Sequence, residues 1–491
     1  MSRSSVRNRV LRAAVHAAVV VVVPGTAAAA TIDFQPYVGA AIGYVDNIEL
    51  NPDFSSNGQP LPQTSDGVIE LEAGFDSRYT SQRLLGGLNY RYRYLDYFDA
   101  DEFDSDFHNL GASGRLIAVQ DLLLFDAGAF YQQQLKDPSG SPGYGNFFNP
   151  GNLRDAWGWN VTPVVTHDFG YVTADASYRY GRVYYTEDRV DGLSEDSTNR
   201  DLRASLATSS PNQPLTWRVF YLSSRTDYVD FDPYRYDQAG VELGWAIGRD
   251  FRLVGEYGVE SDLTQNVEEG GLDSAYWNAG VVYEPNDRNR LEARAGERFF
   301  GDSYEFYLRH VARLAEFNVS YTEQPTTNSN RLGAPNEGPP DEVPPFPDVP
   351  GFQDTRTEAY LLKRWYVALK IDGSRTVVDF SWYNDDQTYF DTGRESNSRA
   401  GQIGVTRELG PRSDVRLWWA RRDWEDFPYE VVPGQVVPGR NTEDQVLALR
   451  FSRDLGRELT LSAETALQWR REQDEDWANG WWLGLRARKT F

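Results

Sequence analysis

The chain lacks cysteine, has a single methionine and four histidines, and shows no long apolar run after its first thirty residues. The absence of cysteine excludes disulfides, thiolate metal sites and thiol catalysis. The absence of long apolar runs excludes transmembrane helices, which need about 20 consecutive apolar residues. Acidic residues exceed basic ones, 73 against 49. This argues against nucleic acid as a partner, because phosphate groups require a basic surface.

Residues 1–30 have the composition of a secretory signal peptide. Four arginines precede an apolar run at residues 13–23, and alanines at residues 28–30 supply the small side chains that a signal peptidase needs. The run, about a dozen residues, is too short for a spanning helix. We therefore predict cleavage before Thr31, which leaves one domain, residues 31–491. The loss of four arginines changes its formal charge from −24 to −28.

Apolar and polar residues alternate through most of this domain. Successive side chains of a strand point to opposite faces, so an apolar face appears at every second position. The pattern is clear in residues 69–75, 84–94, 239–247 and 459–469. Such runs span about ten to thirteen residues, the length with which a tilted strand crosses a bilayer. Strands of soluble proteins average about five or six residues.

Short and long connections alternate between these runs. Short ones fall near residues 80–82, 119–120, 168–170, 248–250, 285–287, 372–374, 410–412 and 455–457. Long ones include residues 96–106, 136–156, 187–199, 324–353, 385–398 and 423–441. Outer-membrane barrels segregate loop length in this way, with short periplasmic turns and long extracellular loops.

These patterns predict an all-β fold, a transmembrane antiparallel up-and-down β-barrel in the outer membrane of a Gram-negative cell. Pairing the runs gives about 22 strands, within a range of about 18–24 because boundaries are soft. We expect no plug domain. A 22-stranded energised transporter needs a folded plug ahead of its first strand, and here the first strand begins within a few residues of the expected cleavage site.

The last run, residues 481–491, alternates up to a terminal phenylalanine, Phe491. A final strand of this kind is similar to the C-terminal signature that barrel-assembly machinery recognises. We therefore predict that Phe491 is an assembly signal and that this machinery is a partner. Outer-membrane lipid and lipopolysaccharide are the other expected partners of such a barrel.

The chain resembles the beta-barrel porin 2 family and, more closely, the PEP-CTERM system-associated outer-membrane β-barrel proteins. The resemblance is carried by residues 34–50, 298–303, 360–365 and 406–413 and by the Phe491 end. These motifs are turns and strand edges that contain no catalytic residue. The resemblance implies a place near exopolysaccharide synthesis and export.

In the expected register several charged residues of both signs face the lumen. The candidates for its lining are Arg91, Arg93, Arg179, Arg218, Arg294, Arg298, Glu242 and Glu256. Such charges most often pair across strands, but arginine ladders also steer anionic solutes, and lumen aromatics such as Tyr307 stack on sugars. Both interpretations stay open at this stage.

Chemistry beyond binding has weak support in the sequence. His108, His167 and His310 share parity with apolar neighbours near strand ends, which is typical of imidazoles at a membrane interface. His108 lies close to Asp104 and Asp106, so an outer-membrane protease is the enzymatic alternative. The acidic residues 96–106 lack the spacing of an EF-hand loop. We expect no catalytic residue, metal or cofactor.

The Pro-rich loop, residues 324–353, is expected to be stiff, and it either enters the lumen or protrudes. Our leading hypothesis is a passive pore or conduit, linked to exopolysaccharide export, that passes polysaccharide or small solutes. The alternative is a structural or polysaccharide-binding surface barrel whose lumen is closed by its own loops. A third hypothesis is an outer-membrane enzyme.

Overall fold

The structure is a computed structural model that describes residues 30–491 apart from 138–139, 141–142, 187–192, 211–212, 334–355 and 433–434. The expected signal peptide, except Ala30, and most of the Pro-rich loop lie outside the described residues. Within the described part of the chain, no helix is long and apolar enough to span a membrane.

Twenty-two strands form one antiparallel sheet, and two more form a separate hairpin. The first half of the barrel comprises β1 Thr31–Asp46, β2 Asp66–Thr80, β3 Leu84–Tyr97, β4 Ser105–Val119, β5 Leu123–Leu135, β6 Leu153–Asp168, β7 Val172–Tyr185, β8 Ser197–Thr208, β9 Leu215–Tyr228, β10 Tyr234–Ile247 and β11 Phe251–Glu260. The second half comprises β12 Ser274–Asn286, β13 Asn289–Arg298, β14 Gly301–Val311, β15 Ala315–Thr326, β16 Tyr360–Asp372, β17 Thr376–Tyr389, β18 Glu395–Gly410, β19 Ser413–Asp426, β22 Arg440–Leu455, β23 Leu459–Glu472 and β24 Ala478–Thr490. The separate hairpin is β20 Tyr429–Val432 and β21 Gln435–Val437.

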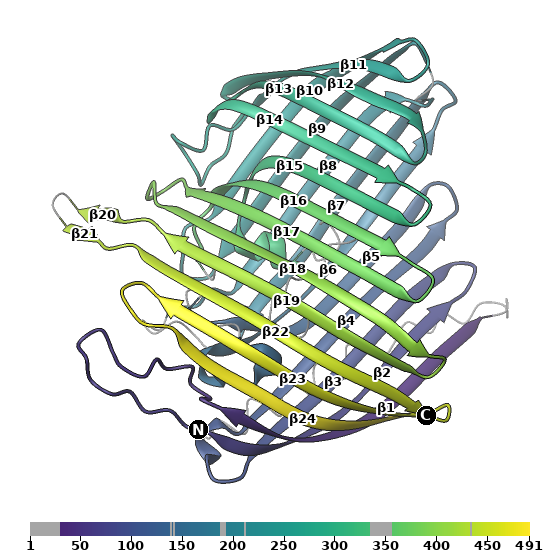
Figure 1. Ribbon diagram of the computed structural model, residues 1–491. Helices are drawn as coiled ribbons and strands as arrows, with labels where there is room; N and C mark the ends of the chain where they lie inside the picture. Colours follow the sequence, from purple (N-terminus) through teal and green to yellow (C-terminus); the bar gives the residue numbers. More distant parts are fainter. Residues whose placement is uncertain are drawn as a thin grey trace.

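The sheet closes into a ring because β1 also pairs with β24. Tyr37 lies opposite Thr490 at one end of this seam and Asp46 opposite Trp481 at the other. Every other barrel strand pairs with its two neighbours along the chain, with β19 passing directly to β22. The barrel of 22 antiparallel strands that we expected is therefore confirmed, and Figure 1 shows its strands running obliquely around the wall.

Alternation in the sequence becomes an inside and an outside of this wall. In β24, Leu483 and Leu485 point outward and are 54% and 62% exposed, whereas Trp482 between them is 2% exposed. The outward positions of the other strands carry similar exposed leucine, valine, isoleucine and aromatic side chains. Such a surface suits hydrocarbon, which needs no hydrogen bonds from the wall.

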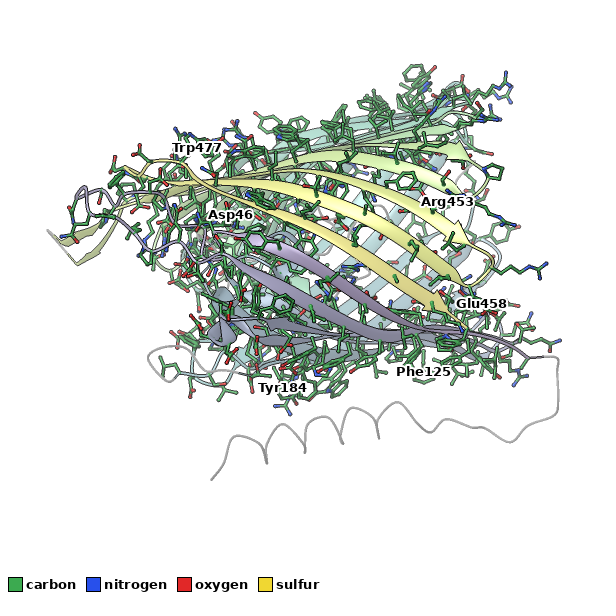
Figure 2. All side chains as sticks on the ribbon, turned by 60° about the horizontal axis from the view of Figure 1, so that its bottom comes forward. Asp46, Phe125, Tyr184, Arg453, Glu458 and Trp477 are labelled. Carbon is green, nitrogen blue, oxygen red and sulfur yellow. The ribbon has the colours of Figure 1, made fainter. Side chains whose placement is uncertain are left out.

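Loop lengths differ between the two ends of the barrel. Turns such as residues 248–250 and 411–412 join strands at the end that also holds the C-terminus, and the long connections lie at the other end. Asp46 and Trp477 mark the long-loop end in Figure 2, and Arg453 and Glu458 the short-turn end.

Some strands extend further than expected into the loops. Polar pairs such as Asp385–Ser398 still form ladder positions there, so the loop expected at 385–398 is only 390–394.

One part of the fold prediction is wrong, namely the lumen without a plug. Two segments of the chain fold into the barrel and pack on its inner wall. The first, residues 143–152, contains the 3₁₀ turns η2 Tyr144–Asn146 and η3 Pro150–Asn152, and we call it the inner loop. The second is helix α2, Asn328–Gly333, the green turn inside the barrel in Figure 1. The barrel is thus partly filled by its own connections. A further short helix, η1 Asp101–Phe103, lies in the loop between β3 and β4.

Candidate functional site in the barrel lumen

The inner loop packs against the wall through aromatic side chains. Tyr144, Phe147 and Phe148 are all at most 5% exposed and belong to one apolar cluster with wall residues that include Trp418 and Trp482. Phe147 stacks on Trp482, with ring centroids 4.1 Å apart and an interplanar angle of 13°. Burial of three aromatic rings is a large apolar contribution, so this segment is firmly held.

Glycines in the wall make room for this stacking. Trp482 lies flat against β1 and β24, where a Cβ on either Gly43 or Gly484 would come within 2.1 Å of its indole ring. The other face of the indole is therefore free to meet Phe147. A side chain at either glycine would force Trp482 away from the wall.

Polar contacts fix the backbone of the inner loop. Arg93 donates from Nη2 to the Gly145 carbonyl at 2.7 Å, and the Tyr144 amide donates to Gln468 Oε1 at 2.8 Å. The Tyr144 hydroxyl also donates to the Glu464 carboxylate. These bonds satisfy several buried polar groups of wall and loop, which avoids the cost of leaving them unpaired.

Helix α2 is anchored to two separate parts of the wall. On one side Asn330 Nδ2 donates to Ser224 Oγ of β9 at 2.9 Å, and Arg179 of β7 donates to Asn330. On the other side Arg331 Nη2 lies 3.6 Å from Asp385 Oδ2 of β17. Strands β10 to β16 separate these anchors on one side of the ring. Helix α2 therefore bridges two parts of the wall across the lumen, and the lumen on either side of it forms a sector.

A band of charged side chains faces the lumen along β9 to β14. Arg294 Nη1 lies 2.7 Å from Glu242 Oε2, and its Nη2 lies 2.7 Å from Glu292 Oε1. Arg218 pairs with the same Glu242 at 3.4 Å, and its side chain is 45% exposed. Glu305, whose side chain is 52% exposed, lies 3.9 Å from Arg294 Nε. Inward side chains this exposed indicate space for water beside the band.

All eight lining candidates lie at inward positions of the strands, but they form separate groups. Arg218, Arg294, Glu242 and Glu256 belong to the charged band, with Glu256 Oε2 3.7 Å from Arg294. Arg91 occupies an inward position of β3, two residues before Arg93.

The other three arginines sit elsewhere on the wall. Arg93 pairs with Glu70 on the side of the inner loop, and both are at most 3% exposed. Arg179 pairs with Asp201 at 2.7 Å below α2, and Arg298 pairs with Glu260 at 2.7 Å. These are cross-strand ion pairs, and they do not form one continuous ladder.

The histidines occupy outer-wall positions near the barrel ends. His108 Nδ1 lies 2.7 Å from the Tyr90 hydroxyl, and its Nε2 lies 3.4 Å from Asp106 Oδ2. Its ring also contacts those of Tyr92 and Tyr131. His167 packs edge-on to Phe169, and His310 Nδ1 lies 2.5 Å from Asn289 Oδ1. These imidazoles thus contact aromatic and polar neighbours on the outer surface.

One carboxylate of the acidic loop between β3 and β4 and one carboxylate of β2 accept hydrogen bonds from backbone amides in and beside this loop. Asp104 Oδ1 accepts from the Tyr97 amide at 2.8 Å, and Asp66 Oδ2 accepts from the amides of Asp99 and Ala100 at 2.8 and 2.9 Å. Across the residues that the structure describes, no group of three or more His, Asp or Glu side chains is placed to hold a metal ion.

Burial and like charges perturb two carboxyl groups at the long-loop end. Burial, and next the nearby Asp391 carboxylate, raise the pKa of Glu358 above its usual 4.5. Burial, followed by Asp232 and Glu268, raises the pKa of Asp391. The neighbouring residues Ala359 and Phe390 belong to an apolar cluster with Tyr234 and Tyr236. Protonation at this mouth of the barrel is therefore coupled to its packing.

Sequence reasoning missed Tyr144, Phe147 and Asn330 as lumen residues. The aromatic-rich stretch YGNFFNP at residues 144–150 was a usable signal, because exposed loops rarely carry so many aromatics unless they pack against something. Asn330 offered no such signal, since polar residues are ordinary in loops.

Comparisons with known proteins give a likeness at the level of fold. No family model and no curated protein matches the chain. The solved structures that it resembles include the siderophore receptor PirA from Acinetobacter baumannii, at 10% identity and a TM-score of 0.43, with 93% of this chain and 80% of that chain covered. The FrpB iron transporter from Neisseria meningitidis matches at 11% identity and a TM-score of 0.46, with 93% and 81% covered. A loop-deletion mutant of OmpT, an outer membrane protein of Vibrio cholerae, matches at 9% identity and a TM-score of 0.30, with 94% and 100% covered.

The closed ring, the apolar outer wall and the charged inner wall define an outer-membrane-type β-barrel. Receptors and transporters stand beside OmpT among the similar structures. At these identities the likeness concerns the fold alone, and it assigns neither a solute nor a ligand.

Proposed function

We propose that this protein is a conduit for hydrophilic solutes across the outer membrane, narrowed by its inner loop and by α2. The observation that carries the proposal is the charged band along β9 to β14, in which Arg218 and Glu305 remain about half exposed although they face the lumen. Charged groups that line a water-filled passage set which solutes enter it. Carboxylates and guanidinium groups alternate in this band, so it suits polyhydroxylated solutes that hydrogen-bond to both.

The two inward segments support a passage that is restricted. The inner loop fills the sector next to β1 and β24, and α2 borders the sector bounded by β10 to β16 with polar contacts. The hydrogen bonds of α2 contribute about 0.5–1.5 kcal/mol each, and Leu332 adds a buried apolar contact with Phe130 and Val183. Removal of its polar anchors should therefore loosen α2 and widen the passage.

The resemblance to the PEP-CTERM system-associated barrels supports exopolysaccharide as the solute. On this proposal the chain belongs to that family, is exported through its signal peptide, and sits in the Gram-negative outer membrane among lipopolysaccharide. The lumen aromatic Tyr307, which lies beneath the Arg290 guanidinium at 6.0 Å, is a platform on which a sugar ring can stack. We propose no catalytic role, since the chemistry described here is binding and passage.

Planar-bilayer recordings test the conduit directly. The wild-type protein is expected to show small stepwise conductance. An Asn330→Ala/Arg331→Ala variant is expected to show larger steps, because both anchors of α2 are weakened. Asn318→Ala/Arg309→Ala, at the short-turn end of β14 and β15, serves as a matched control with unchanged steps. Silence of both the wild type and the α2 variant would contradict a conduit.

A second candidate is a structural or polysaccharide-binding barrel whose lumen is closed by its own loops. The buried aromatic cluster of the inner loop favours it, because Phe147 and Phe148 are at most 2% exposed and seal their sector. Retention of exopolysaccharide on cells that carry the protein, together with bilayers that never conduct, is the result expected from this alternative.

A further inference from the structure

The wall has one short seam, between β14 and β15. Six residue pairs join these strands, from Phe306–Tyr321 to Val311–Glu316. Their other neighbours are paired more fully, β14 with β13 in ten pairs and β15 with β16 in twelve. The segments 301–305 and 322–326 are thus paired on their far sides only. In the described barrel no other seam has so few pairs.

Two side chains hold the backbone groups that the missing pairs would have joined. If the register continued, Tyr304 would lie opposite Glu323. Instead, the Tyr304 amide donates to the Glu323 carboxylate, Oε2, at 3.1 Å. The Glu323 carbonyl accepts from Arg298 Nη1 at 3.2 Å. The seam is therefore closed by side chains where a β-ladder would normally close it.

Three donors converge on the Glu323 carboxylate at the outer surface. Besides the Tyr304 amide, the Tyr321 hydroxyl donates to Oε1 at 2.5 Å, and Lys363 Nζ lies 4.0 Å from the same oxygen. The Glu323 side chain is only 2% exposed, although it sits at an outward position. Phe300, which has Arg298 and Lys363 against its ring at 5.0 and 5.8 Å, covers the same place.

The surroundings join the membrane interface to the lumen. Tyr321 and Trp365 form an outward aromatic pair, 4.8 Å between centroids, directly below the unpaired segments. Outward tyrosine and tryptophan mark the interfacial level of a barrel. On the inner side, Arg298 reaches Glu260 at 2.7 Å, and Glu305 belongs to the charged band. Unpaired strand edges are costly in hydrocarbon, which is consistent with a seam that parts only near the headgroups.

We propose that the upper β14–β15 seam is a lateral opening between the lumen and the outer leaflet, which admits an amphiphile with an anionic head and an alkyl or acyl chain. Glu323 occupies the position of the anionic head and latches the opening when no ligand is bound. An incoming phosphate or carboxylate takes over the Tyr304, Tyr321 and Lys363 donors, and its chain lies between the parted strands, beside Glu305 and Thr322. This opening goes beyond the conduit of hydrophilic solutes and does not depend on its conductance.

Photolabelling of the purified full chain in phosphatidylcholine vesicles tests the opening. The probe is dodecyl phosphate with a diazirine in its alkyl chain, and labelled residues are mapped by mass spectrometry. We expect label on the inward residues Glu305 and Thr322 beside the seam. We expect none on Ala368 and Ser381, which face each other inside the fully paired β16–β17 seam. Label confined to outward residues such as Tyr304 would overturn the proposal.

Two variants distinguish loss of the Glu323 latch from a general loosening of the seam. Glu323→Ala is expected to raise inward labelling at least about tenfold, which corresponds to a loss of about 1.4 kcal/mol of closing free energy. Glu297→Ala, an exposed carboxylate on β13, the other neighbour of β14, is expected to leave labelling unchanged. Equal labelling in both variants, or labelling by uncharged dodecyl maltoside equal to that by dodecyl phosphate, contradicts an anion-selective latch.

A disulfide gives a second measurement that does not rely on removal of the latch. The chain has no cysteine, so Glu305→Cys/Thr322→Cys forms one unique disulfide when the seam closes. Oxidation should suppress inward labelling of neighbouring residues, and reduction should restore it. Persistence of inward labelling in the oxidised form would refute passage through this seam. Added lipid A distinguishes the sources: competition identifies the lipid of the leaflet as occupant, and lack of competition identifies a smaller amphiphile.

Discussion

Phe147 and Trp482 stack face to face although 335 positions separate them in the chain, with their ring centroids 4.1 Å apart. One ring belongs to a loop and the other to the strand that closes the barrel. The contact therefore holds the inner loop against the wall, and substitution of either residue removes it.

Phe147→Ala should release the inner loop. Loss of a buried phenylalanine costs about 3–5 kcal/mol. This destabilises the packing of the inner loop and not the wall, because the wall keeps its ladder hydrogen bonds. We expect larger conductance steps and faster proteolysis within residues 143–152. Trp481→Ala, an outward residue beside Trp482, is the control and should leave both measurements unchanged. Equal conductance in Phe147→Ala and wild type would show that the inner loop does not restrict the passage.

Arg294→Gln should shift the passage toward cations. It leaves Glu242 and Glu292 without the guanidinium that lies 2.7 Å from each of them. Each carboxylate keeps a second arginine, Arg218 for Glu242 and Arg290 for Glu292, so we expect only a small fall in the unfolding temperature. Reversal potentials in a potassium chloride gradient measure the selectivity. Arg200→Gln removes an exposed pair with Asp227 on the outer face of the wall, worth about 0–1 kcal/mol, and should leave the selectivity unchanged.

The long-loop mouth should pack more tightly in acid. The pKa of Glu358 and that of Asp391 are both raised in the folded protein. Such groups contribute their stability below the ordinary pKa, and the contribution is lost as the pH rises through the raised folded pKa. Hydrogen exchange at residues 389–394, corrected for its intrinsic pH dependence, should therefore show greater protection at pH 4 than at pH 7.5. A Glu358→Gln/Asp391→Asn variant should lose this dependence, and a dependence that persists in it must come from other groups.

Loss of the Phe491 ring should slow assembly. The assembled barrel should be nearly as stable as the wild-type barrel. Its amide donates to the Pro36 carbonyl at 2.9 Å, but its ring is 61% exposed. The side chain therefore contributes little packing, and we predict that its value lies in recognition by the assembly machinery. Pulse-chase measurement of heat-modifiable, folded barrel should show delayed appearance for Phe491→Ala. Leu455→Ala, another exposed apolar residue at the same end, should assemble at the wild-type rate.

The wall was predictable because each strand repeats one simple rule. Glu70 and Leu71 lie on opposite faces in the structure, as alternation requires, and so do Trp481 and Trp482. Parity also placed Arg218 and Arg294 inside. It could not identify their partners, because Arg294 meets Glu242 three strands away.

The filling of the lumen was not predictable in the same way. Tyr144 packs against Trp418 and Asn330 bonds to Ser224, contacts between distant parts of the chain that follow no local period. The short pairing between β14 and β15 was not predictable from the sequence either. Residues 301–305 and 322–326 alternate like the rest, and a pairing that fails to form leaves no trace in composition.

The seam between β1 and β24 has a consequence for how the protein comes into being. Residues 37–46 meet residues 481–490, so the barrel cannot close until both segments have been synthesised. Until then the sheet has two unpaired edge strands, which can pair with any other extended polypeptide. A folding rate set by this one contact between very distant residues is therefore built into the architecture.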